Sequence, residues 1–136
     1  MKKNVYLLVA ILIIGIWIVS CKPKSGSPVA EPAFTPTKML TASGTEPGWI
    51  VLVNQVKKNI YEADITYAYG QEKYKTTVTK LEGTNLGYIG QIDRAGQKTE
   101  VYIAYIAQNC MDMAEKNHPL TVTLKIGDEI HYGCGD

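Results

Sequence analysis

Apolar and polar residues alternate with a period of two along most of the chain after its first third. The clearest case is the segment 61–67, where Tyr61, Ala63, Ile65 and Tyr67 alternate with acidic and threonine side chains. Such alternation is typical of a half-buried β-strand. Similar patterns predict seven strands, over residues 49–53, 61–67, 74–81, 86–92, 99–107, 120–126 and 130–134.

Turn-forming residues separate these strands at short and even intervals. Gly70 with Gln71 and Gly127 with Asp128 are two examples. Short strands in consecutive hairpins favour an all-β fold, a small antiparallel meander barrel or sandwich of about seven to eight strands with one disulfide. Residues 99–107 are apolar on both faces, which predicts a central strand that is covered on both sides.

The N-terminal residues follow a different pattern. Lys2 and Lys3 precede an uninterrupted apolar run over residues 5–19, and the small Ser20 follows it. A basic start, a short apolar core and a small residue before the cleavage site are typical of a secretory signal peptide. The run is shorter than the roughly 20 residues that a helix needs to cross a hydrocarbon core.

The sequence Ile18-Val19-Ser20-Cys21 resembles the lipobox of bacterial lipoproteins. This resemblance implies that Cys21 receives a diacylglycerol, that the signal peptide is cut before it, and that its amine is then acylated. Two or more acyl chains hold a protein stably at a membrane. We therefore expect residues 1–20 to be a lipoprotein signal peptide and Cys21 to be the membrane anchor.

Four of the six prolines lie between residues 22 and 40, with serine, glycine and threonine among them. Proline interrupts helices and strand ladders and favours extended polyproline II structure. We therefore expect a lipidated cysteine with a proline-rich tether over residues 21–40, followed by one β-barrel-like domain over residues 41–136.

The charge balance bears on the partners of the chain. Without Lys2 and Lys3 of the predicted signal peptide, 12 of the 14 basic residues remain, against 13 acidic residues. This near-neutral balance gives no electrostatic basis for nucleic-acid binding. Lys22 and Lys24 beside Cys21 are too few to bind anionic lipid headgroups. The expected membrane contact is the lipid on Cys21.

Two cysteines remain after Cys21, so a single pairing exists between them. In a small exported domain Cys110 and Cys134 are expected to form a disulfide, because the compartment is oxidising. The loop-entropy model assigns such a bridge about 3–4 kcal/mol of stability. The alternation places Tyr132 and Cys134 on one face, and we expect Cys110 to close its loop against the core side of that strand.

The sequence contains no recognisable catalytic motif. It has two histidines, His118 and His131, and no nucleophile elbow, His-Glu-x-x-His pattern or glycine-rich phosphate loop. Asp112 and Glu115 are three residues apart, but acids on a surface loop are more often solvated than paired. We therefore expect neither an enzyme nor a cofactor.

One cluster has the donor types of a copper site. Cys110, Met111, Met113 and His118 combine thioether and imidazole ligands, which suit copper in an exported protein. Against this, Cys110 has a disulfide partner, and methionine commonly fills cores. A periplasmic copper-binding protein is therefore a less favoured alternative, with Met111, Met113 and His118 as its candidate ligands.

The segment Glu46-Pro47-Gly48-Trp49 has two interpretations. Pro47 fixes its own φ and keeps Glu46 extended, and Gly48 suits a bend. In the first interpretation Glu46 lies at the mouth of the barrel and contacts a ligand or partner. In the second, which the pattern favours, the segment is the rigid start of a strand and Trp49 caps the core.

Three short motifs together resemble a family of uncharacterised bacterial envelope lipoproteins. They are G-x-E-P-x-W at residues 44–49, C-x-D-x-M near residues 110–113 and a closing Y-x-G-C near residues 132–134. In this chain Met113 comes one residue earlier than the family's methionine, and the closing motif lacks one residue. The resemblance implies the fold and an envelope location, but no activity.

These features predict a lipid-anchored cell-envelope protein that is a non-catalytic binding or structural module. Lys22 stands where some Gram-negative lipoproteins carry the aspartate that retains them at the inner membrane. The resemblance to lipoproteins therefore indicates the outer membrane, facing the periplasm. The candidate binding residues are Glu46, Trp49, Asp112 and Tyr132.

Inhibition of lysozyme is a second hypothesis. Small anchored β-barrel inhibitors of that enzyme resemble this chain in the lipobox, the size, the single disulfide and a Y-x-C element, here Tyr132-Gly133-Cys134. They also use a Ser-Gly-x-x-Tyr loop, and the tyrosine is missing after Ser43-Gly44. A third hypothesis is a purely structural envelope component, whose surface would have no hollow for a ligand.

Overall fold

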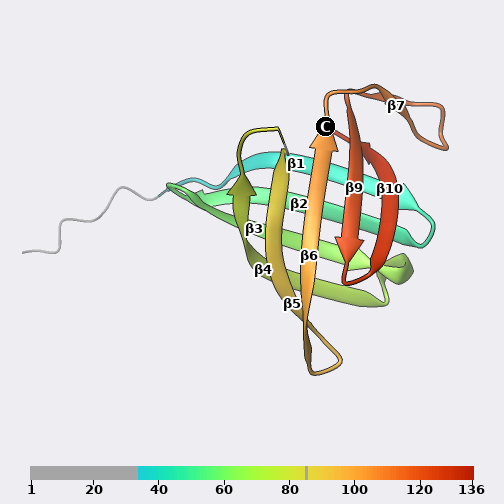
Figure 1. The fold of residues 1–136 in the computed structure, drawn as a ribbon. Helices are drawn as coiled ribbons and strands as arrows, with labels where there is room; N and C mark the ends of the chain where they lie inside the picture. The colour runs from blue at the N-terminus through green and yellow to red at the C-terminus, as the bar shows by residue number, and fades with distance from the viewer. Residues whose placement is uncertain (1–33, 85) are drawn as a thin grey trace, which may run out of the picture. The chain divides into compact units, whose positions relative to one another are not determined.

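The structure, a computed structural model, describes residues 34–84 and 86–136; Cys21 lies outside the described residues. Eight antiparallel strands form a closed barrel (Figure 1), which confirms the predicted all-β meander fold. The barrel strands are β1 (Thr37–Thr45), β2 (Gly48–Lys57), β3 (Ile60–Tyr67), β4 (Glu72–Leu81), β5 (Gly87–Arg94), β6 (Gln97–Ile106), β9 (Leu120–Ile126) and β10 (Glu129–Gly135).

Two further elements lie outside the barrel ladder. A two-stranded ribbon, β7 (Cys110–Met111) paired with β8 (Asn117–His118), connects β6 to β9. A single 3₁₀ turn, η1 (Ala68–Gly70), connects β3 to β4. Across the described residues, no helix has the length and apolarity that a bilayer span requires.

The barrel closes where β1 pairs with β10. Ser43 lies opposite Cys134, and Thr41 and Asp136 exchange backbone hydrogen bonds of 3.0 and 2.8 Å. Because the strands run up and down, their connections gather at two ends. The proximal end holds the start of β1, the β2–β3 turn, the β4–β5 loop, the ribbon between β6 and β9, and the end of β10. The distal end holds the β1–β2, β5–β6 and β9–β10 turns and η1.

The alternation of the sequence does not predict β1, which begins inside the range expected to form the tether. The buried apolar side chains of this strand are Leu40 and Ala42, and small polar residues follow them. Pairing with β2 on one side and β10 on the other holds the strand in place although its own pattern is weak. Strand pairing therefore begins at Thr37.

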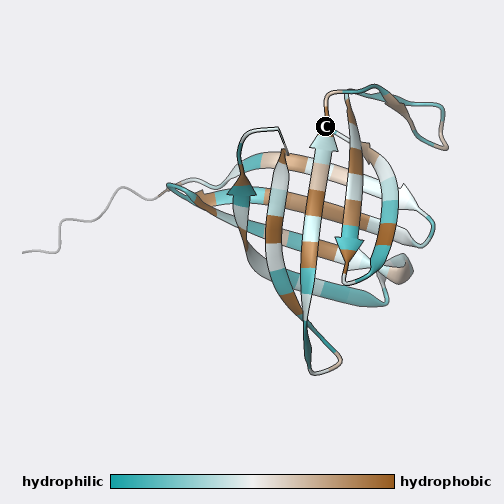
Figure 2. Cartoon of the chain, viewed as in Figure 1, coloured by the Kyte–Doolittle hydropathy of each residue, from teal (hydrophilic) through white to brown (hydrophobic). Residues whose placement is uncertain are grey.

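Inward-facing apolar side chains fill the barrel. Figure 2 shows apolar and polar residues alternating along the strands. Trp49 is the largest side chain of the core and is 1% exposed. The same core contains buried aliphatic side chains from β1, β2, β3, β6 and β9, among them Leu40, Val51, Ile65, Ile103 and Leu124. A barrel of eight strands is narrow enough for side chains to fill it, so this interior is a core.

The expectation that residues 99–107 are covered on both faces is wrong. Val101 and Ile103 of β6 point inward and are buried, whereas Ile106 is 54% exposed. A closed barrel has one interior, and no second layer covers the outer face of β6 within residues 34–84 and 86–136. The apolar character of the outer positions therefore does not come from burial in this fold.

Strands β1 and β10 approach each other closely beside Trp49. A Cβ atom at Gly133 would lie 2.1 Å from the carbonyl oxygen of Ser43 and 2.7 Å from Cζ2 of Trp49. A Cβ atom at Gly44 would lie 2.3 Å from Nε1 of the same indole. Glycine at both positions lets the two closing strands pack against the tryptophan.

We expect Gly133→Ala to lower the free energy of unfolding by about 3 kcal/mol, because the added methyl group must displace backbone as well as the indole. Urea unfolding followed by Trp fluorescence measures this. Thr77→Ala, at an exposed position of β4, is the control and should change stability by less than about 0.5 kcal/mol. Equal midpoints for the two variants would contradict the close approach.

Candidate functional site

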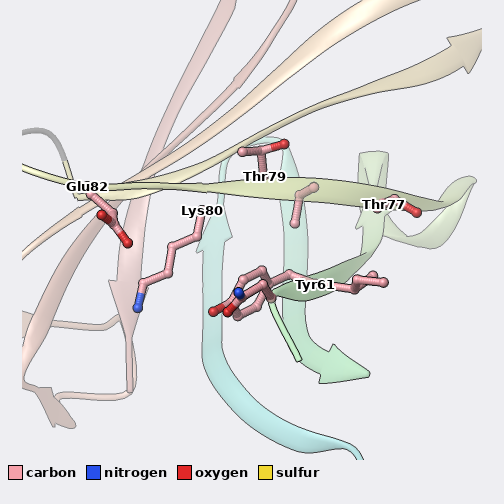
Figure 3. A pocket seen from close by; sticks show the side chains of 8 residues that line it. Tyr61, Thr77, Thr79, Lys80 and Glu82 are labelled. Atoms are coloured by element: carbon pink, nitrogen blue, oxygen red, sulfur yellow. The ribbon is translucent and has the colours of Figure 1, made fainter. Parts of the chain in front are cut away.

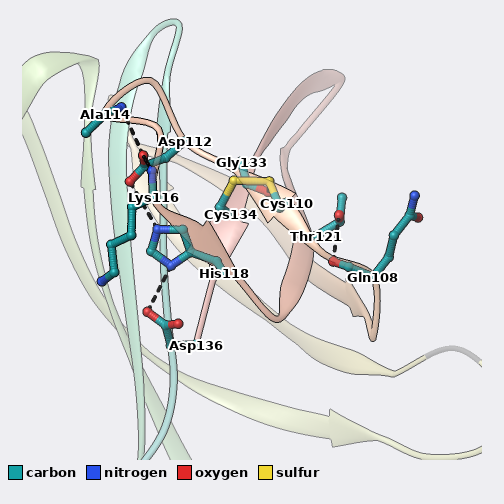
Figure 4. The surroundings of a disulfide bond; sticks show 10 residues. All are labelled: Gln108, Cys110, Asp112, Ala114, Lys116, His118, Thr121, Gly133, Cys134 and Asp136. Atoms are coloured by element: carbon teal, nitrogen blue, oxygen red, sulfur yellow. Dashed lines mark hydrogen bonds and ion pairs between the residues drawn. A yellow bond between two sulfur atoms is a disulfide. The ribbon is translucent and has the colours of Figure 1, made fainter.

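The ribbon is attached to the barrel by the predicted disulfide. Cys110 of β7 and Cys134 of β10 are bonded, with their Cα atoms 5.4 Å apart (Figure 4). The bridge lies on the outside of β10, which corrects the expectation that it closes on the core side. The reason is the alternation of β10: Gly133 and Gly135 face the core, so Cys134 faces outward beneath the ribbon.

The turn of the ribbon is fixed by one carboxylate. Oδ1 of Asp112 accepts hydrogen bonds of 2.9 Å from the backbone N–H groups of both Ala114 and Lys116. The backbone of Asp112 also bonds Lys116 and Glu115 at 3.0 Å. These bonds hold Glu115 in the left-handed region, at φ 61°. A loop held in this way loses little conformational entropy when it binds.

His118 connects the ribbon to the end of β10. Its Nε2 lies 3.0 Å from Oδ2 of Asp112, and its Nδ1 lies 3.0 Å from Oδ2 of Asp136 (Figure 4). The hydrogen bonds to Asp112 and then Asp136 raise the pKa of His118, and the same bond lowers the pKa of Asp112. The protonated imidazole can donate to both carboxylates, whereas the neutral ring has one N–H group.

The surface beside these contacts is apolar. Met111, Met113 and Tyr132 are 63%, 81% and 70% exposed. A hollow of about 280 Å³ lies between them and the end of β1, where Ser43 and Thr45 contribute small hydroxyl side chains. We call Met111, Met113, Tyr132 and this hollow the ribbon surface.

A second hollow, of about 500 Å³, lies on the other side of β1. The ring of Tyr69 covers Gly48 there, and its hydroxyl donates a 2.9 Å hydrogen bond to the carbonyl oxygen of Thr45. The backbone of Tyr69 is in the left-handed region, at φ 55°, while its side chain makes these two contacts. The end of β1 therefore forms a low ridge of small residues between two hollows.

The structure separates the binding residues that the sequence suggests. Tyr132 is part of the ribbon surface, and Asp112 lies beneath it as the residue that fixes the turn. Glu46 is exposed at the distal end, beside a cis peptide bond to Pro47. Trp49 lies in the core and cannot contact a partner unless the barrel opens.

The geometry does not favour the copper site. Cys110 is bonded to Cys134, and both ring nitrogens of His118 face carboxylates, so two of the four suggested donors are engaged. Met111 and Met113 remain exposed. Among the described residues, no group of three or more His, Cys, Asp or Glu side chains is placed to hold a metal ion.

A polar network at the distal end was not suggested by the sequence. Arg94 of β5 donates to Glu72 of β4 at 3.1 Å and to Glu129 of β10 at 2.8 Å, and its guanidinium lies 5.3 Å from the ring centre of Tyr67. The Tyr67 hydroxyl donates to Glu129 at 2.6 Å and lies 2.9 Å from Nε2 of His131. Burial and then the bond to Glu129 raise the pKa of Tyr67 to about 12, so it stays a donor.

The alternation of inward-facing positions along β5 and β10 could have identified residues of this network. Arg94 follows the buried Ile92 by two residues, and Glu129 and His131 share the inward phase of β10. The sequence does not show that these strands face one another across the distal end. The network closes the barrel there and is a structural feature rather than a free binding site.

Comparison of the chain with protein-family models, with curated proteins and with solved structures found no match. Its function therefore has to be inferred from the geometry described above.

We expect Arg94→Met to lower the free energy of unfolding by about 1 kcal/mol at pH 7, because the partly buried Glu72 and the half-exposed Glu129 lose a charged donor. Tyr74 and then Arg94 lower the pKa of Glu72, and Tyr67 and then Arg94 lower that of Glu129. Their stabilisation is present above the ordinary glutamate pKa of 4.5 and is lost as pH falls through the lower folded values.

The loss of stability on acidification should therefore be shallower in Arg94→Met than in the natural chain. Urea unfolding at pH 7 and at several values below 4.5 measures this. Lys98→Met, which removes an exposed lysine 4.0 Å from Asp93, is the matched control. Parallel acid curves for Arg94→Met and the natural chain would contradict the role of the network.

We expect the imidazole of His118 to titrate above the ordinary histidine value of 6.5. Because the folded pKa is raised, the contact of the ribbon with Asp136 is fully formed below pH 6.5 and weakens as pH rises through the folded pKa. NMR titration of the imidazole measures this, and Asp136→Asn should bring the midpoint down. A midpoint that is the same in Asp136→Asn would show that the Nδ1 contact is absent in solution.

Proposed function

We propose that this chain is a lipid-anchored, non-catalytic binding module of the cell envelope, and that the ribbon surface is its contact with a protein partner. The observation that carries the proposal is the exposure of Met111, Met113 and Tyr132 on a ribbon that is otherwise fixed. Methionine and tyrosine are enriched at protein interfaces, whereas a solvent-facing loop is more often polar. The hollow between them offers a pocket for an anchoring side chain.

The rigidity of the ribbon supports binding rather than a merely structural loop. The disulfide fixes one end of the ribbon, Asp112 fixes its turn, and His118 fixes its return strand. Such pre-organisation raises affinity by reducing the ordering cost on association. A non-catalytic role fits the same contacts, because the ring nitrogens of His118 are already bonded to carboxylates and the ring is not placed to act as a free base.

The proposed anchor is the lipid on Cys21, with the outer membrane, facing the periplasm, as the expected location. The support for it is the lipobox-like sequence and the residue after it, Lys22. The chain from residue 22 to the start of β1 would then link the anchor to the barrel.

Site-specific photocrosslinking in the native envelope tests the contact surface. We expect a benzoyl-phenylalanine at position 113 to give a discrete adduct that is lost when Tyr132→Ala is added, since removing an interface tyrosine commonly weakens binding about tenfold or more. The same probe at Glu100, an exposed position of β6, is the matched control. Identical adducts at both positions, or none at position 113, would contradict the proposal.

Lysozyme is the second candidate partner, and the tip of the ribbon favours it. Glu115 is an exposed acid held in one conformation by the bonds around Asp112, as an inhibitor that inserts a loop into the lysozyme cleft requires. The exported chain with Cys21→Ser should inhibit a chicken-type, goose-type or invertebrate-type lysozyme at submicromolar concentration. Glu115→Ala should lose this inhibition and Glu100→Ala should keep it. No inhibition at tens of micromolar would remove lysozyme as the partner.

A further inference from the structure

The proximal end of the barrel collects exposed apolar side chains from segments that are far apart in the sequence. They come from the start of β1, the β2–β3 turn, the β4–β5 loop and the end of β6 (Figure 1). The exposed apolar residues of this end are Phe34, Met39, Ile60, Leu86 and Ile106. Scattered apolar residues on a surface need no explanation, but a ring of them at one end of a barrel does.

Lysines lie among these apolar side chains. Lys38 precedes Met39 on β1, and Lys57 and Lys58 occupy the exposed β2–β3 turn next to Ile60. Lys80 of β4 borders a hollow of about 300 Å³ at the same end. The four lysines converge because the up-and-down topology brings their strands to one end, although no two of these segments are adjacent in the sequence.

The hollow adds an aromatic side chain to this end. Figure 3 shows Lys80 of β4 and Glu82, which follows this strand, on the side that faces Tyr61 of β3. Glu82 is the exposed acid of this group, so the lysines outnumber it. Asp136 also lies near this end, but it is paired with His118.

The distal end also has exposed apolar side chains, Ile50, Tyr69 and Ile130, and exposed lysines, Lys73 and Lys98, but acidic residues balance its charge. Its exposed residues include Glu46, Asp93 and Asp128, and its arginine, Arg94, is bonded to two glutamates. The excess of lysines over acidic residues is therefore larger at the proximal end than at the distal end.

We infer that the proximal end docks on the surface of an anionic bilayer. Exposed apolar side chains enter the headgroup region while lysines bind anionic headgroups, and tyrosine suits the boundary between them. The chain from the predicted anchor also joins the barrel here, through Phe34, so the tether leads to this end rather than to the distal end. The inference rests in part on the anchoring proposed above, and it adds a defined orientation in which the distal end points away from the bilayer.

The lysine cluster of the proximal end is not visible in the sequence alone. Lys22 and Lys24 by themselves are too few for headgroup binding, and the other lysines are scattered along the chain. The fold supplies the missing cluster by bringing Lys38, Lys57 and Lys58 to the end at which the chain enters the barrel.

The test uses the full chain in vesicles, with an environment-sensitive fluorophore on a cysteine introduced at Ile60 or, as the matched position, at Gln97 of the distal end. Cys21 is lipidated, so the new cysteine is the free thiol. We expect a blue shift for the probe at position 60 in phosphatidylglycerol-containing vesicles and a smaller one in pure phosphatidylcholine. The probe at position 97 should not shift. Flotation of the vesicles measures attachment independently.

Lys57→Gln with Lys58→Gln should lower the docked-to-undocked ratio roughly tenfold to thirtyfold, and high salt should act in the same direction. The pair Lys73→Gln and Lys98→Gln, exposed lysines outside the proximal end, is the control.

Equal emission at positions 60 and 97 in chains that float would overturn the docking inference and leave the anchor intact. Chains that do not float would contradict the anchor and the inference together. A shift that depends on protein concentration without vesicles would assign this end to self-association and overturn the inference.

Discussion

The closure of the barrel between β1 and β10 is the constraint on which the rest of the structure depends. The two strands share a short ladder around Ser43 and Cys134, and glycines at positions 44 and 133 allow them to lie against the indole of Trp49. Strand β10 also positions Tyr132 and Cys134 on the outside and Glu129 and His131 on the inside. A fault in this closure would therefore disturb the core, the ribbon attachment and the distal network together.

The distal end is held by side chains where the backbone ladder is incomplete. Between β4 and β5 the register begins at Val78 opposite Gly90, and before it a hydroxyl of Thr76 bonds the carbonyl oxygen of Gln91 at 2.6 Å. Within the described chain, residues 129–133 of β10 pair with β9 alone. Arg94 spans both openings because it reaches Glu72 on one side and Glu129 on the other. A partly exposed charged network of this kind is sensitive to pH, which an all-apolar closure would not be.

The two surfaces proposed for binding differ in physical character. The ribbon surface is small and pre-organised, and its three large side chains are available because the residues beneath them are already bonded to one another. The proximal end is broader, and its contacts are distributed over apolar and cationic side chains that suit a fluid surface better than a fitted pocket. If the proximal end docks on a bilayer as proposed, the rigid ribbon that starts from that end would be presented in a limited range of orientations.

The sequence by itself determined the fold class and the disulfide, because period-two alternation and a single possible cysteine pairing are local or countable signals. It also indicated that Trp49 belongs to the core. It did not reveal β1, since a strand with the two buried side chains of Leu40 and Ala42 is stabilised by its neighbours rather than by its own pattern. The outward position of the disulfide, the carboxylate pair around His118, the Arg94 network and the lysines of the proximal end were decided by the tertiary structure. Each depends on which strands face one another around a closed barrel, and alternation along one strand carries no information about that.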